Sequence, residues 1–161
     1  MPTSTERIKE LREKTGAGVM ECKRALDEGG SMDEAEQLLK KWGLATAEKK
    51  AGRETSQGLI DSYIHAGRIG AMVELNCETD FVARTDDFKT LAREVAMQVA
   101  ATNPTRISAQ EESSDGDVPL LDQPYIRDPG RTVQDLVNEA IAKVRENIVI
   151  RRFARFELGG Q

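Results

Sequence analysis

Apolar residues in the first 43 positions recur at spacings of three and four, which places them on single faces of helices. The three stripes comprise Ile8 and Leu11, then Val19, Cys22 and Leu26, then Ala35, Leu38, Leu39 and Trp42. Thr3 with Glu6, and Ser31 with Glu34, have the spacing of N-terminal capping boxes. Glycines separate the stripes and Gly43 follows the last one, so we expect a bundle of three short helices over residues 1–43.

A different periodicity begins beyond this segment. Residues 44–57 are rich in alanine and lysine and are expected to form a partly helical linker. Residues 58–65 and 68–77 have the composition and alternation of two strands joined by a short Ala-Gly turn. In the second strand every other residue is apolar, so one face of that strand should point to the core.

The rest of the chain predicts helices that cover a sheet. The expected elements are a helix with an apolar stripe from Phe88 to Val99, a turn at Asp128–Pro129–Gly130, a helix over 133–144 and a strand over 148–157. The last strand carries apolar residues on both faces, which indicates that something covers each face. The helices can cover one face and a second copy of the chain the other. The fold class expected is α+β, with a three-stranded core domain over residues 58–161.

Charge sets one segment apart from the others. Residues 111–128 hold six acidic and one basic side chain without regular periodicity, so we expect an exposed acidic loop over 111–121. The whole chain has 28 acidic and 23 basic residues, and its net charge of −5 argues against general nucleic-acid binding. No apolar run approaches the roughly 20 residues of a membrane span, and no apolar leader follows Met1. A cytoplasmic protein without membrane contact is therefore expected.

The chain offers few residues for catalysis or metal binding. His65 is the only histidine, and Cys22 and Cys77 lie far apart, so a zinc site is hard to assemble and both cysteines are expected to be free thiols. Asp86 and Asp87 do not face each other on a helix and are better explained as charges at a helix N-terminus. Phosphate-binding glycine loops and nucleophile motifs are missing. We expect a binding protein that is not an enzyme and has no cofactor.

The strongest candidate contact site is the run Thr79, Asp80, Phe81 and Val82, where a predicted strand gives way to a helix. Because Phe81 lies seven residues before Phe88, periodicity alone favours a core position at the start of the helical stripe, with Thr79 or Asp80 as the cap. An exposed Phe81 would instead form an aromatic anchor beside a carboxylate, which is typical of binding hot spots.

A second candidate surrounds the break between the first two helices. Val19 and Met20 are adjacent, so both cannot point fully into a small bundle, and one should be at least partly exposed. With Arg12 and Lys23 beside them, they form either an ordinary surface or a docking patch with basic neighbours. His65 lies at the end of the predicted hairpin, where the sequence identifies neither the nucleophile nor the orienting group that a general base needs. A contact role for His65 stays open.

Several long motifs resemble the bacterial elongation factor Ts family, in order and over nearly the whole chain. They are LREKTGAGVMECKRAL at 11–26, SYIH at 62–65 with RIG at 68–70, NCETDFVA at 76–83, DQPYIRDP at 122–129 and ENIVIRRF at 146–153. The resemblance implies an N-terminal ubiquitin-associated-like three-helix domain and an antiparallel sheet in the α+β core. It also implies guanine-nucleotide exchange on the translation GTPase elongation factor Tu, by a factor that itself binds no nucleotide.

The resemblance also implies roles for the candidate residues. Arg12, Val19, Met20 and Lys23 would face the GTPase domain from the bundle. Phe81 would insert between helices of that domain, while Asp80 disturbs the magnesium and phosphate environment of GDP. Thr79 and Val82 flank this exchange element, and His65 would lie in a second contact surface.

Three departures from the family pattern are visible. Longer relatives contain two copies of the core, whereas this chain has one, and short relatives restore the pair as homodimers through the sheet. Many relatives insert a helical coiled-coil hairpin where this chain has its acidic loop. Where the family usually has the glycine of Gly-Glu-Asn-Ile, this chain has Arg145, so the turn expected at this position is in doubt.

Two other classes of protein fit parts of the sequence. One is an adaptor that joins a ubiquitin-associated-like bundle to a dimerisation domain, and it would have no need of the Thr79–Val82 motif. The other is an RNA-binding module that uses Arg151, Arg152 and Arg155, whose affinity would depend steeply on salt. The acidity of the chain and its few aromatic residues favour a solvated or interfacial strand face for these arginines.

Overall fold

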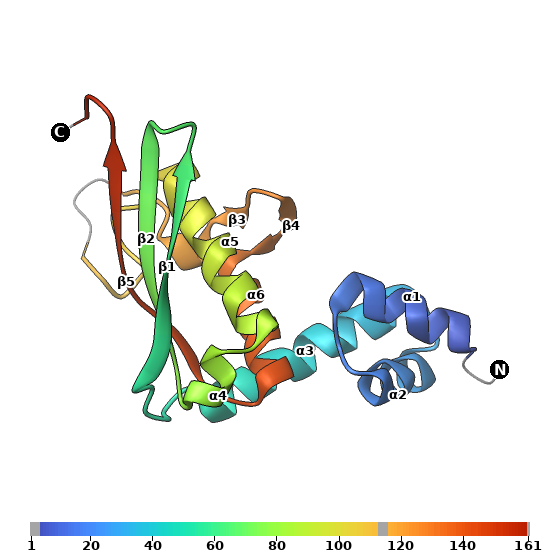
Figure 1. The fold of residues 1–161 in the computed structure, drawn as a ribbon. Coiled ribbons are helices and arrows are strands. Elements are labelled where there is room, and N and C mark those ends of the chain that lie inside the picture. Colours follow the sequence, from blue (N-terminus) through green and yellow to red (C-terminus); the bar gives the residue numbers. More distant parts are fainter. Residues whose placement is uncertain (1–3, 113–115, 161) are drawn as a thin grey trace.

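The computed structural model describes residues 4–112 and 116–160, and places a helical bundle at one end and a sheet with its covering helices at the other (Figure 1). Thr3, expected in the first capping box, lies outside the described residues. Ser4 caps the first helix instead, since its side-chain oxygen accepts a hydrogen bond from the backbone N–H of Arg7 at 3.3 Å.

The predicted three-helix bundle is confirmed. It consists of α1 (Thr5–Thr15), α2 (Val19–Gly29) and α3 (Met32–Lys50). Its buried core is small and comprises Leu11, Cys22, Ala25, Leu26 and Ala35. Gly16 ends α1 in the left-handed conformation, and its N–H donates to the carbonyl of Arg12. The likeness to a ubiquitin-associated domain stays a prediction.

The prediction that the third helix stops at Gly43 is wrong, because α3 continues to Lys50. A glycine inside a helix costs only about 1 kcal/mol relative to alanine. The residues that follow Gly43 are mostly alanine, leucine, glutamate and lysine, which favour helix. Gly43 itself is buried near Ala142 of α6 (Val133–Val144), so packing of α3 on α6 also supports the continuous helix.

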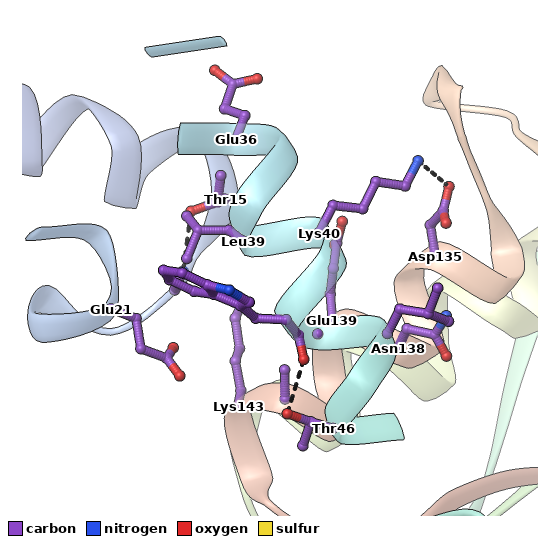
Figure 2. Close-up of a pocket in the computed structure, with 15 residues that line it drawn as sticks. Thr15, Glu21, Glu36, Leu39, Lys40, Thr46, Asp135, Asn138, Glu139 and Lys143 are labelled. Carbon is purple, nitrogen blue, oxygen red and sulfur yellow. Dashed lines mark hydrogen bonds and ion pairs between the residues drawn. The ribbon is translucent and has the colours of Figure 1, made fainter. Parts of the chain in front are cut away.

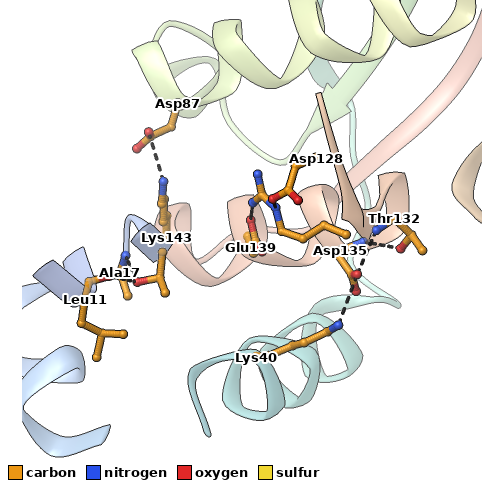
Figure 3. A network of polar contacts seen from close by, with 11 residues as sticks. Leu11, Ala17, Lys40, Asp87, Asp128, Thr132, Asp135, Glu139 and Lys143 are labelled. Atoms are coloured by element: carbon orange, nitrogen blue, oxygen red, sulfur yellow. Dashed lines mark hydrogen bonds and ion pairs between the residues drawn. The ribbon is translucent and has the colours of Figure 1, made fainter. Parts of the chain in front are cut away.

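Ion pairs flank the seam between α3 and the core (Figure 3). The ammonium group of Lys40 on α3 lies 3.3 Å from the carboxylate of Asp135 on α6. Asp135 also completes the capping box of α6 with Thr132. On the far side of α6, Lys143 lies 3.8 Å from Asp87. Such partly exposed pairs contribute about 0–1 kcal/mol each, so neither adds much to stability.

Three antiparallel strands form the main sheet in the order β1, β2, β5. Their bounds are Gln57–His65, Ile69–Cys77 and Ile148–Glu157, close to the ranges predicted. One face is buried beneath α5 (Asp86–Thr102) and α6, and no helix of the described residues covers the opposite face (Figure 1). The predicted alternation along β2 is confirmed, since Ala71, Val73, Leu75 and Cys77 all lie in the core.

Helix α5 has the predicted apolar stripe, and all of its members are buried: Phe88, Leu91, Ala92, Val95 and Val99. Thr85 caps the helix, and Asp86 and Asp87 occupy its first turn, where negative charge is favourable. Periodicity did not indicate that Gln98 is also buried. Its side chain donates to Gln123 and Pro124 and accepts from the backbone N–H of Ile126, which joins α5 to a small second sheet.

Two loop predictions need correction. Residues 128–130 do not form a turn but belong to β4 (Asp128–Thr132), which pairs with β3 (Pro124–Tyr125), so the turn falls at residues 126–127. Residues 113–115 of the expected acidic loop lie outside the described residues, and its described part, 111–112 and 116–121, is exposed only in part. Leu120, in the short helix η1 (Leu120–Asp122), is fully buried in the core, because the apolar residues at the end of the loop turn inward.

Candidate partner-binding site

The candidate site is built on the corner between β2 and the short helix α4 (Asp80–Ala83). Thr79 is the N-cap of α4, and its hydroxyl accepts a hydrogen bond from the backbone N–H of Val82 at 3.3 Å. Asp80 is exposed and pairs with Arg84 at 3.3 Å. Phe81, beside it, has 76% of its surface exposed. An aromatic and an acidic side chain therefore project together from a capped corner.

The exposure of Phe81 overturns the core position that periodicity favoured. The stripe from Phe81 to Phe88 is not continuous, because α4 ends at Ala83 and a new cap at Thr85 starts α5. Ala83 is the residue of α4 that turns into the core, while Val82 is half-buried against it. The neighbouring Phe81 consequently points outward, where it contributes nothing to the core.

Two glutamates that the sequence analysis missed hold this corner. Glu146, just after α6, accepts hydrogen bonds from the backbone N–H of Thr79 at 2.9 Å and from its hydroxyl at 2.7 Å. In return, the side chain of Glu78 accepts from the backbone N–H of Asn147 at 2.9 Å. Both glutamates belong to motifs that carry the family resemblance. Their place in these motifs is the only feature of the sequence that could have pointed to them.

Asn147 extends the same network to the end of α3. Its buried side-chain amide donates to the carbonyls of Ala51 and Arg53 at 3.3 and 2.9 Å. The guanidinium group of Arg53 lies 3.6 Å from Glu78. The segment that links the bundle to the sheet is thus fastened beneath the corner.

Arg145 occupies the position where the family usually has glycine, and it adopts the left-handed conformation with φ of 61°. The questioned turn therefore keeps a glycine-like geometry, at a cost of about 1 kcal/mol for a residue with a side chain. The guanidinium group of Arg145 lies 2.8 Å from Glu21 at the start of α2, so it also bridges the core to the bundle.

The second candidate patch lies on the bundle. Val19 and Met20 begin α2, and both are exposed, at 48% and 71% of their surfaces. They point outward because Cys22 occupies the inward position of that turn. Arg12 and Lys23 are also exposed, so all four side chains are available for contact on either side of the break between α1 and α2.

The structure does not bring His65 to the corner. It ends β1 opposite Ile69, whereas the corner follows Cys77 at the other end of β2. At about 3.3 Å per residue, the two sites lie about 25 Å apart along the strands. His65 is exposed, and its Nδ1 lies 3.1 Å from the hydroxyl of Tyr63.

The arginines of the last strand do not form one basic surface. Arg152 pairs with Glu74 at 2.8 Å and holds the pKa of that carboxyl below its usual range, while Arg151 lies 3.8 Å from the same carboxylate. Arg155 turns toward α5 and donates to the carbonyl of Ala100. This arrangement fits the solvated or interfacial strand face better than an RNA-binding surface.

A pocket lies apart from the corner, in the seam between α3 and α6 (Figure 2). Figure 2 shows the ion pair of Lys40 and Asp135, two of the residues that line it. The hydroxyl of Thr46, also in the lining, donates a hydrogen bond to the carbonyl of Trp42. Its lining comes from both the bundle and the core, so it marks where these parts meet.

Among residues 4–112 and 116–160, no three His, Cys, Asp or Glu side chains are grouped to hold a metal ion. No helix within these ranges has the length and apolarity to cross a membrane.

Both cysteines are free and buried, and burial raises the pKa of each thiol. The pKa of Cys77 rises to about 11 from its ordinary 9.0, and the carboxylate of Glu146 adds to the effect. We expect neither thiol to react with Ellman's reagent in the native protein at pH 8, and both to react in guanidinium. Rapid release of the chromophore by native protein would contradict this expectation.

The same shift predicts how stability changes at alkaline pH. Between about pH 9 and 11 the Cys77 thiol stays protonated in the folded chain but ionises in the unfolded one. The unfolded state then binds fewer protons, so the free energy of unfolding falls as pH rises through this window. Urea unfolding of wild type and Cys77→Ala at several pH values gives the difference between their free energies of unfolding. This difference should shrink as pH rises.

The family model described as Elongation factor TS matches residues 46–115 and 78–161 of the chain. Elongation factor Ts from Thermoanaerobacter sp. (strain X514) is 48% identical, covering 97% of this chain and 95% of the relative. Its counterparts from Thermodesulfovibrio yellowstonii and Herpetosiphon aurantiacus are 44% and 43% identical, with at least 98% of either chain covered. The first match extends over 193 aligned positions, more than the 161 residues here, so that relative has residues this chain lacks.

Proposed function

The chain belongs to the elongation factor Ts family of translation elongation factors, and from that premise we propose that it promotes the release of GDP from elongation factor Tu. The activity would be nucleotide exchange by binding, with no covalent step and no cofactor. The location that fits this role is the cytoplasm.

The observation that carries the proposal is the exposed Phe81 beside Asp80 on a corner fixed by hydrogen bonds. A large aromatic side chain in water gains free energy when a partner buries it, and rigid aromatic groups are typical hot spots. Phe81 would enter an apolar crevice of the GTPase domain. Asp80 would then bring negative charge toward the magnesium ion and phosphates of the bound GDP.

Exchange requires that this protein and GDP weaken each other's binding by the same factor. A tenfold weakening corresponds to about 1.4 kcal/mol of differential binding. Burial of one phenylalanine contributes about 1.5–3 kcal/mol, so Phe81 can account for one to two powers of ten. A larger effect has to draw on further contacts.

The bundle patch of Arg12, Val19, Met20 and Lys23 is the further contact that we propose with the GTPase domain. Its two apolar side chains are exposed and its two cations would complement acidic groups of the partner. His65 would belong to a separate contact at the other end of the β1–β2 hairpin. We propose no direct contact with nucleic acid, since Arg152 is paired and Arg155 points inward.

The test is the release of fluorescent GDP from elongation factor Tu, followed with and without this protein. We expect the rate to rise with the concentration of the protein and then to reach a plateau. Release no faster than in buffer would overturn the proposed function.

We also propose that a second copy of the chain covers the open face of the sheet. This face carries exposed apolar side chains, namely Ile60, Ile64, Met72, Phe156 and Leu158. Contiguous exposed apolar surface marks interaction sites in soluble proteins. The nearby Glu74, Arg151 and Arg152 carry both signs of charge, which suits a surface that packs against itself.

Substituting Phe156 with glutamate should convert the dimer to a monomer, because a charge would be buried within the proposed interface. Sedimentation velocity at micromolar concentrations measures the change in mass. Val118→Glu, at an exposed apolar residue of the acidic loop, serves as the matched control and should leave the dimer intact. A monomeric wild-type protein would refute this proposal.

A further inference from the structure

The β2 and β5 strands end at a pair of crossed hydrogen bonds made by side chains. Cys77 and Ile148 are the last residues paired in the ladder. Beyond them, Glu146 accepts from the backbone N–H of Thr79, and Glu78 accepts from the backbone N–H of Asn147. Each glutamate directly precedes, in its own segment, the residue whose backbone N–H bonds the other glutamate. Glu78 precedes Thr79, which donates to Glu146, and Glu146 precedes Asn147, which donates to Glu78. The ladder is thus continued by two glutamates at the point where the backbones diverge.

Every polar group of Thr79 is engaged in this arrangement. Its N–H and hydroxyl both donate to Glu146, and the hydroxyl oxygen accepts from Val82. Its carbonyl accepts from the backbone N–H of Ala83 and from the thiol of Cys77. Because a threonine hydroxyl has one hydrogen, donation to Glu146 fixes which way its lone pairs point. The cap of α4 therefore depends on Glu146.

Helix α4 also packs on β1 and β2, and the hydroxyl of Thr85 donates to the carbonyl of Val82 at 2.7 Å, but its N-terminal end is held by Thr79 and Glu146. Four residues are far fewer than a helix needs to be stable by itself in water. Only Ala83 of α4 is buried, and Asp80 and Phe81 project into solvent. The direction in which Phe81 points is set by the cap and by the anchoring of Thr79.

We infer that Glu146 is a positioning residue for exchange: it lies half-buried behind the corner and holds Thr79 so that α4 presents Phe81 in one orientation. This inference rests on the proposed function. Glu146 need not touch the partner, because its two acceptor oxygens are used within the chain. A preorganised side chain binds more tightly than a mobile one, since less ordering is left for the binding step.

Glu146→Gln tests the inference with little change in shape. The amide keeps one acceptor oxygen but replaces the other with a donor, so the N–H or the hydroxyl of Thr79 loses its partner. We expect the plateau rate of GDP release from elongation factor Tu to fall about tenfold. Thr79→Val should act alike, whereas Thr79→Ser keeps the hydroxyl and should retain most of the rate.

A double-mutant cycle with Phe81 separates positioning from general destabilisation. If Glu146 acts through Phe81, the double variant Glu146→Gln, Phe81→Ala should promote GDP release at the same rate as Phe81→Ala alone. Glu94→Gln, at a half-buried carboxylate of α5 away from the corner, is the matched control and should keep the wild-type rate. Independent losses that multiply in the double mutant, or an unchanged rate in Glu146→Gln, would overturn the inference.

Hydrogen exchange gives a readout that does not require the GTPase. In Glu146→Gln the amides of Thr79 and Val82 should exchange at least tenfold faster, while core amides such as that of Val95 keep their protection. Unchanged protection at Thr79 and Val82 would refute the positioning role even if the exchange activity itself proved absent. A different combination of results would refute the proposed function alone. In it, Glu146→Gln shows the predicted loss of protection, but the wild-type protein does not speed the release of GDP from elongation factor Tu.

Discussion

Phe81→Ala is expected to slow the release of GDP from elongation factor Tu by about 10- to 100-fold, with little change in melting temperature. The rate falls because the buried aromatic surface gained on binding is lost, about 1.5–3 kcal/mol. The fold persists because the side chain is 76% exposed and contacts solvent on the corner. Stopped-flow fluorescence of labelled GDP and thermal unfolding by circular dichroism give the two readouts.

Two companion variants make this result specific. Phe81→Leu keeps an apolar side chain and should recover part of the rate. Ile126→Ala removes an exposed apolar residue at the β3–β4 turn, far from the corner in sequence, and should leave the rate unchanged. If Phe81→Ala lost its cooperative melting transition, Phe81 would be a core residue and the anchor role would be refuted.

The largest loss of stability is expected for Gly58→Ala, at about 3–5 kcal/mol. Gly58 has φ of 152°, and a Cβ there would lie 2.1 Å from the carbonyl oxygen of Leu75 and 2.8 Å from Cα of Asn76. Both are backbone atoms of β2, so β1 has to move away and its hydrogen bonds weaken. Strained backbone and overpacking each cost about 1–3 kcal/mol, which supports this magnitude.

The melting temperature measures this effect and should fall by about 10 °C or more. Gly67→Ala is the matched control, since Gly67 also has positive φ, of 68°, but nothing lies within 4 Å of the added methyl group. It should cost about 1 kcal/mol, the penalty of the left-handed conformation alone. Equal melting temperatures for the two alanine variants would contradict the close approach of β1 and β2.

Local periodicity predicted the elements whose side chains meet a single core. The alternation around Val73 and Leu75 and the stripe from Phe88 to Val99 each reflect one buried face, so both were confirmed. Element boundaries were predicted wrongly at glycine and proline residues, which can end an element or lie inside one. Gly43 is typical of a helix end, but here packing on α6 accompanies an unbroken helix. Pro129 and Gly130 are typical of a turn, but here they lie in a strand.

The candidate site was predictable in part. The motif Thr79–Val82 was found from its place in the chain and from the family resemblance, whereas its periodicity pointed to the core. The contacts of Glu146 with Thr79 and of Glu78 with Asn147 join segments more than 60 residues apart. Such contacts leave no trace in local spacing, because they depend on which strand ends the fold brings together. For the same reason the buried bonds of Gln98 were not foreseen.

The continuous α3 has a consequence for dissecting the protein. The proposed division at residue 43 runs through the middle of a helix, and the half beyond it carries Ala47 into the core of the sheet domain. A fragment cut at residue 43 would shorten the helix that the bundle depends on, and the remaining core would lose a buried side chain. An isolated bundle should therefore extend through residue 51, and the intact chain should denature in one step rather than as two separable units.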